Sequence, residues 1–99
     1  MHKSIYSLYD KKALVYMNPL VFGNDGEAMR WFTSVVNREE DTNVALHPQD
    51  FILCRLGVLD DESGKFTNEY VELAQGNSVK VSEPVYTIKQ LINMIQEGR

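Results

Sequence analysis

The run Phe51–Val58 constrains the fold of this chain most, because eight almost wholly apolar residues there precede a loop with three consecutive acids and a glycine. An apolar run of this length bounded by turn residues predicts a β-strand. Asp60–Gly64 predicts the loop of a hairpin that returns through Lys65–Thr67, and Gly64 supplies the positive φ that such loops need. The sequence therefore predicts a sheet built around this hairpin.

Four further strands are predicted from short runs rich in aromatic and branched residues: Ser4–Tyr9, Ala13–Met17, Tyr70–Ala74 and Val79–Val81. The first two pair across a polar break, and the last two flank a turn. Between them, Pro19–Gly23 is expected to be a partly buried connection, and His47–Pro48 an extended entry to the central strand.

Two helices are predicted from capping signals and apolar stripes. Asn24 is the expected N-cap of the first helix, Asp25–Asn37, because Glu27 can return the hydrogen bond. Its apolar stripe consists of Ala28, Met29, Phe32, Val35 and Val36. The second helix begins with a capping box at Thr87–Gln90, ends at Gly98, and has the buried stripe Ile88, Leu91, Ile92 and Ile95.

The resulting order is β-β-α-β-β-β-α, which predicts one α+β domain over residues 1–99 with an antiparallel sheet and two helices. In the central strand one face is expected to form the core: Ile52, Cys54, Leu56 and Val58. The other face holds Phe51, Leu53, Arg55, Gly57 and Leu59, with Tyr6 or Tyr9 on neighbouring strands. We expect this second face to lie under a helix, with a homodimer seam or a stacking platform as alternatives.

Net charge limits the partners. The chain carries −4 overall, without the basic surplus of an autonomous DNA-binding protein. Residues 39–72 hold nine acids and two bases, or −7, and the rest of the chain is +3. Any DNA contact is therefore expected in the N-terminal third or the C-terminal segment. No apolar run approaches a membrane span and the first residues lack a signal pattern, so a cytoplasmic protein is expected.

Catalytic and metal-binding patterns are absent from the sequence. His2, His47 and Cys54 match no zinc spacing, and Asp60–Glu62 lacks the alternating ligands of a calcium loop. A Cys54–His47 nucleophile is disfavoured because Cys54 lies on an apolar face. We find no phosphate-binding loop or nucleophile elbow and expect neither enzyme activity nor a cofactor.

One cluster suggests a contact with single-stranded DNA: Lys11, Lys12, Arg30 and Trp31. Aromatic rings stack on bases and cations neutralise phosphates, provided the first helix packs on the first hairpin. The alternative is that Trp31 seals the edge of the core while the lysines solubilise an exposed turn, and the residues favour it somewhat.

Two blocks carry a family resemblance: "NDGEAMRWFTSVVN" and "HPQDFILCRLGVLDDESGKF". They resemble the pattern ND-x-x-A-x-R-x-F…HPEDF-x-L-x-x-(I/L)G-x-(F/Y)D-x-x-(T/S)G of the small non-structural protein of gokushovirus-type microviruses, which are single-stranded DNA bacteriophages. The departures are Gln49 for an acid and Leu59 for an aromatic. The matching residues are Asn24, Asp25, Arg30, Phe32, His47, Pro48, Asp50, Gly57 and Gly64. His47–Asp50 is interpreted as a turn, with a recognition corner as the alternative.

The resemblance implies a protein of the host bacterial cytoplasm, absent from the mature virion, that acts in genome replication or the switch to packaging. Our first hypothesis is single-stranded DNA binding. The second is an adapter that docks a replication or capsid protein, of the virus or of its host, on the acidic loop Asp60, Asp61 and Glu62. In both cases we expect a homodimer without membrane contact.

Overall fold

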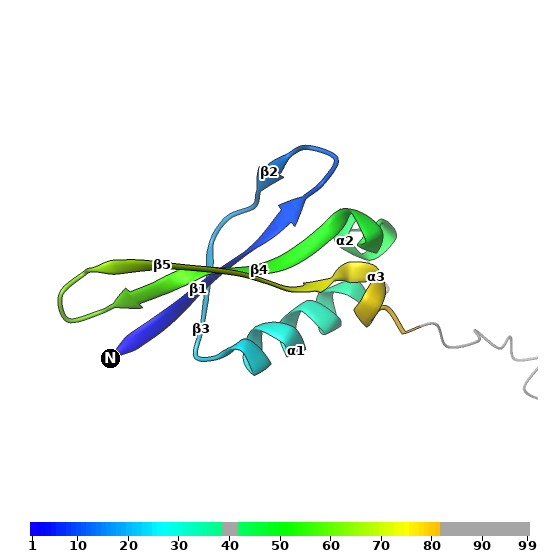
Figure 1. Ribbon diagram of the computed structural model, residues 1–99. Coiled ribbons are helices and arrows are strands. Elements are labelled where there is room, and N and C mark those ends of the chain that lie inside the picture. Colours follow the sequence, from blue (N-terminus) through cyan, green and yellow to red (C-terminus); the bar gives the residue numbers. More distant parts are fainter. Residues whose placement is uncertain (39–41, 82–99) are drawn as a thin grey trace, which may run out of the picture.

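The computed structural model describes residues 1–38 and 42–81, which form an antiparallel sheet with its helices on one face and at one end (Figure 1). Its elements are β1 (His2–Asp10), β2 (Val15–Tyr16), β3 (Leu20–Phe22), α1 (Asp25–Val36), α2 (Asn43–Leu46), the 3-10 turn η1 (Pro48–Asp50), β4 (Phe51–Asp60), β5 (Phe66–Gln75) and α3 (Gly76–Val79). The predicted α+β class with an antiparallel sheet is confirmed.

The strand order is β2-β1-β4-β5, and β3 also pairs with β1. Strand β4 pairs with the whole length of β1 on one side. On the other side of β1, the short strands β2 and β3 pair one after the other, as a single return strand interrupted at Pro19, which has no N–H. The predicted strand Ala13–Met17 is therefore too long, and Leu20–Phe22 was wrongly expected to be a connection. Leu14 instead closes the β1–β2 turn at φ 59°.

Helix α1 is capped and buried largely as predicted. The Asn24 side chain accepts the Glu27 N–H at 2.9 Å, and the Glu27 carboxylate accepts the Gly23 N–H at 3.0 Å, one residue earlier than a capping box requires. The stripe of Ala28, Phe32 and Val36 is fully buried. It packs on the core cluster contributed by β1, β4 and α2: Tyr6, Leu8, Phe51, Leu53 and Val44.

The second face of β4, that of Phe51, Leu53 and Arg55, lies under the helical layer as expected. The first face was wrongly expected to form the core, because Ile52 and Cys54 are buried but lie outside the core cluster. The alternation does not persist, because the register with both neighbouring strands shifts near Leu56. Because both faces of β4 are mostly apolar, the composition of the strand did not show that the core cluster forms on the second face.

The connections near the ends of β4 and β5 also differ from expectation. His47–Pro48 leads into the turn η1 and is not extended, and β5 is one continuous strand. The predicted strand Val79–Val81 is wrong, because α3 ends at Val79 and the Asn37 side chain bonds to Val79 O at 3.0 Å and Val81 N at 2.8 Å. The predicted helix after Thr87 lies outside the described residues.

Candidate nucleic-acid interface

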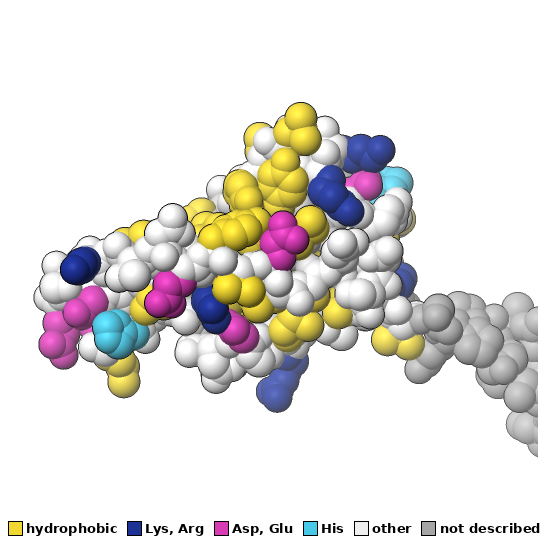
Figure 2. Space-filling view, viewed as in Figure 1, with side chains coloured by type: hydrophobic (Ala, Val, Ile, Leu, Met, Phe, Trp, Pro, Cys, Tyr) yellow, Lys and Arg dark blue, Asp and Glu magenta, His cyan; other side chains and the backbone are white. Residues whose placement is uncertain are grey.

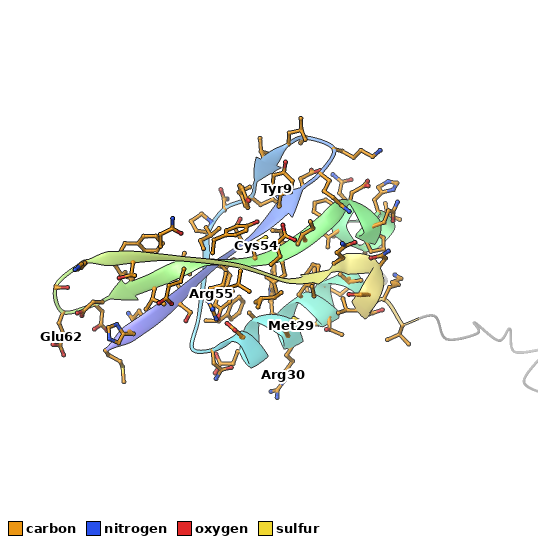
Figure 3. All side chains as sticks on the ribbon, in the orientation of Figure 1. Tyr9, Met29, Arg30, Cys54, Arg55 and Glu62 are labelled. Carbon is orange, nitrogen blue, oxygen red and sulfur yellow. The ribbon has the colours of Figure 1, made fainter. Side chains whose placement is uncertain are left out.

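The sheet face opposite α1 carries three tyrosines, which we call the tyrosine face: Tyr9, Tyr16 and Tyr70. Tyr9 lies on the side of the sheet away from Arg30 of α1 (Figure 3). The ring centroids of Tyr9 and Tyr16 are 4.7 Å apart, and those of Tyr16 and Tyr70 are 6.3 Å apart at an interplanar angle of 89°. The rings thus form a continuous aromatic cluster across the sheet.

The cluster forms because the two central strands carry small residues beneath it. Tyr16 of β2 and Tyr70 of β5 come from opposite edges of the sheet, yet their hydroxyls are 2.9 Å apart. Below them Ser7 pairs with Cys54, and both residues are 0% exposed. Side chains this short leave room for the edge tyrosines to lean inward, and the tyrosines bury them in turn.

The tyrosine face also carries one acidic side chain, because Glu72 of β5 is the cross-strand partner of Cys54. Burial raises the pKa of the Cys54 thiol, and the hydrogen bonds with Cys54 and Tyr16 raise the pKa of Tyr70. Even so, Tyr16 and Tyr70 remain 47% and 46% exposed, and hydrophobic side chains gather on this part of the surface (Figure 2). Neutral, half-exposed rings are surfaces on which unpaired bases can stack.

Lys11 and Lys12 lie in the turn next to this face, which we call the lysine turn (residues 11–14). The Asp10 carboxylate accepts the N–H groups of Lys12 at 2.9 Å and Ala13 at 3.1 Å, which fixes the turn. Both lysines are exposed, and neither forms an ion pair with the residues that the structure describes. Their ammonium groups are therefore available to a phosphate backbone.

Arg30 and Trp31 do not join the lysines. Arg30 is exposed on α1 and points away from the sheet, whereas the lysine turn lies beyond the opposite face (Figures 1 and 3). Trp31 packs against Phe22, with ring centroids 5.7 Å apart, and lines a small hollow of about 180 Å³ with Leu8 and Leu20. This arrangement agrees with the alternative in which Trp31 seals the edge of the core.

The acids Asp60, Asp61 and Glu62, which we call the acidic tip, lie at the end of the β4–β5 hairpin. Asp60 accepts the Glu62 N–H at 2.9 Å, and this hydrogen bond lowers the pKa of the Asp60 carboxyl. Asp61 lies 3.0 Å from the Met1 ammonium and 3.9 Å from Lys3 Nζ. Glu62 is 85% exposed, projects from the tip (Figure 3) and has Oε1 3.6 Å from the Met1 ammonium. All three acids thus have local partners.

A partly buried polar network, missed in the sequence, joins α1 to the sheet. Asp25 accepts the Tyr6 hydroxyl and the Arg55 guanidinium, each at 2.6 Å. The Tyr6 hydrogen bond and the guanidinium lower the pKa of the Asp25 carboxyl, and burial raises the pKa of Tyr6. One signal was available: a charge inside an apolar strand needs a partner, and Asp25 starts the helix that covers Arg55.

His47 and Cys54 are not brought together. Cys54 Sγ bonds to Ile52 O and Tyr70 Oη, whereas His47 lines a cleft of about 450 Å³ where β1, α2 and η1 meet. Within residues 1–38 and 42–81, no group of three or more histidine, cysteine or acidic residues is arranged to hold a metal ion. None of the helices in the same part of the chain combines the length and apolarity needed to cross a bilayer.

The comparisons with known proteins agree with the phage resemblance. The family model described as Phage ORF5 protein matches residues 3–79. Protein ORF5 of Chlamydia phage 1 is 40% identical over 70 residues, which cover 67% of this chain and 72% of that protein. No solved structure shows a significant match. These similarities support a gokushovirus-type phage protein, and the chain belongs to the Phage ORF5 protein family.

Proposed function

We propose that this protein is a non-enzymatic, non-structural phage protein that acts in genome replication, or in the switch to packaging, by binding single-stranded DNA on the tyrosine face. One observation carries the proposal: Tyr16 and Tyr70 present half-exposed rings beside the lysine turn, on a sheet face that none of the described helices covers. Bases stack on such rings without sequence preference, and lysines beside them neutralise the backbone.

The distribution of charge makes this proposal compatible with a net charge of −4. The three acids of the acidic tip lie at the far end of the sheet from the lysine turn, whereas Asp10 and Asp50 lie beside Lys12 (Figures 1 and 2). Since exposed charges more than about 10 Å apart are screened at 0.1 M salt, the tip does little to repel DNA bound at the other end. Binding is expected to be weak and to depend on ionic strength.

Fluorescence anisotropy of a labelled single-stranded 30-mer of dT, titrated with protein over a range of salt concentrations, tests the proposal. Each lysine that contacts a phosphate contributes about 0.7 to the slope of log affinity against log salt. Lys11→Ala/Lys12→Ala is therefore expected to reduce the slope by about 1.4, whereas Arg30→Ala, on the other side of the molecule, is expected to leave it unchanged. Equal slopes for both variants would contradict the assignment of the lysine turn.

A second function, docking of a basic partner protein on the acidic tip, is favoured by the projection of Glu62 from the hairpin. Asp61→Lys/Glu62→Lys leaves Asp60, which caps the turn, in place. If the tip is a docking site, wild-type protein binds a labelled oligolysine peptide at low salt and this variant does not. Equal binding by the two proteins would exclude the tip as the contact.

A further inference from the structure

A polar cleft, which we call the corner cleft, opens beside the lysine turn. It has a volume of about 450 Å³ and lies where the β1–β2 turn, α2 and η1 meet. The lining residues come from three separate segments: Asp10, Lys12, Asn43, His47, Gln49, Asp50 and Phe51. Figure 2 shows the histidine of this end of the molecule beside basic and acidic side chains.

The fold explains the backbone of this corner but not its side chains. His47 N–H donates to Asn43 O at 2.8 Å, Asp50 N–H to His47 O at 3.0 Å, and Lys11 N–H to Asp50 O at 2.8 Å. No hydrogen bond to another described residue engages the side chains of His47, Gln49 or Asp50. These groups converge on the cleft without a role in holding the corner together.

The chemistry of the cleft suits a base better than a phosphate. Two carboxylates face one lysine, so the lining is not a site for a phosphate group. Both backbone N–H groups that Asp10 accepts reach its Oδ1, whereas neither side-chain oxygen of Asp50 accepts from another described residue, so Asp50 is the carboxylate with both acceptors free. Guanine presents two adjacent donors, N1–H and N2–H, to such a carboxylate, and its O6 and N7 accept from a lysine such as Lys12.

We propose that the corner cleft binds a guanine base of the single strand held on the tyrosine face. This inference rests on the proposed function, since Lys12 belongs to both the lysine turn and the cleft. The Asp50 carboxylate accepts the two N–H donors of the base, Lys12 donates to O6, and Phe51 forms the apolar floor. Asn43 and Gln49 supply amides to the rim.

The test compares labelled dT20 with otherwise identical strands that carry one dG, dA or dC at the central position. The expected result is that the dG strand binds about 5- to 100-fold more tightly than dT20, the range of one bidentate base contact. The readout is the affinity ratio of the dG strand to dT20, which Asp50→Asn is expected to bring close to 1. Glu69→Gln, a neutralised carboxylate outside the cleft, is the matched control and keeps the preference.

The outcomes separate the two claims. If dT20 binds and the central dG adds nothing, or if Asp50→Asn keeps the preference, the cleft proposal is wrong while DNA binding stands. If no strand binds even at low salt, both fail. A preference for dA or dC over dG would also overturn the assignment, because neither base offers two adjacent donors to one carboxylate.

Discussion

At the scale of single residues, Asp25 is the polar link between helix α1 and the sheet. It is the shared acceptor of Tyr6 and Arg55, and it lies in the first turn of α1, where a negative charge is favoured by the helix dipole. The Arg55 Nε atom is buried without a hydrogen-bond partner among the described residues. The hydrogen bond to Asp25 therefore compensates for the hydration that the guanidinium loses.

This network predicts a stability that depends on pH at the acidic end. Because the pKa of Asp25 is lowered in the folded protein, its contribution is present above the unfolded value, about 3.9, and is lost as pH falls through the lower folded value. Asp25→Asn is expected to cost about 1 kcal/mol at pH 7, the lower end for a charge-assisted hydrogen bond because the side chain is partly exposed.

Urea unfolding of both proteins between pH 7 and pH 3 checks this expectation. The difference between wild type and Asp25→Asn shrinks as pH falls below about 4. Asp61→Asn, which removes an exposed pair with Met1, is the control and is expected to show no measurable change. A difference between wild type and Asp25→Asn that stays constant over this range would contradict the account.

Individual roles were predictable where local chemistry decides them and unpredictable where a partner distant in the sequence does. Asn24 and Glu27 lie three residues apart, and the cap of Asn24 on the Glu27 N–H follows from the sequence, although the Glu27 carboxylate accepts from Gly23 and not from Asn24. Tyr16 and Tyr70 are 54 positions apart and meet only because the strands between them carry small residues. No local pattern indicates such a contact, which is why the tyrosine face was missed.

At the scale of elements, the approach of α3 to η1 fixes the corner of the molecule. A Cβ on Gly76 would lie 2.1 Å from the Pro48 carbonyl oxygen, a backbone atom that cannot move aside cheaply. Gly76→Ala is expected to destabilise the fold by about 1–3 kcal/mol through overpacking. Asn77→Ala on the same short helix is the control and stays within about 0.5 kcal/mol of wild type in urea unfolding. Equal midpoints for both variants would show that the corner is not tightly packed.

The elements that the sequence predicts correctly are those with complete local signals. Helix α1 has a cap and a stripe, and β4 has a long apolar run. The errors in element type fall on the short segments β3, η1 and α3, whose conformation depends on their tertiary neighbours. Leu20–Phe22 becomes a strand because the β1 edge is open to it, and residues 79–81 lose their strand because Asn37 bonds to them.

At the scale of the whole molecule, β5 is an edge strand of ten residues without lysine or proline, devices that normally discourage pairing. We expect two copies to pair β5 with β5 antiparallel. A two-fold axis through Tyr70 sets Glu69 opposite Val71 and keeps glutamates from facing one another. Such a dimer places both tyrosine faces on the same side of one continuous sheet.

Size-exclusion chromatography with light scattering, at a range of protein concentrations, measures this association. Val71→Lys is expected to give a monomer, because it puts a charge on the outer edge of β5. Val21→Lys puts the same charge on the edge that β3 forms, and it is the control expected to remain dimeric. A monomeric wild type at high micromolar concentration would contradict the pairing.

The central claim is that the exposed tyrosines bind single-stranded DNA, and the most direct test is the affinity of Tyr16→Leu/Tyr70→Leu for a dT 30-mer at low salt. Loss of a stacked base costs about 1–3 kcal/mol, so the variant is expected to bind at least about 5-fold more weakly than wild type. Tyr16→Phe/Tyr70→Phe keeps the rings and is expected to retain most of the affinity. Wild-type affinity in the leucine variant, confirmed as folded by circular dichroism, would contradict the account.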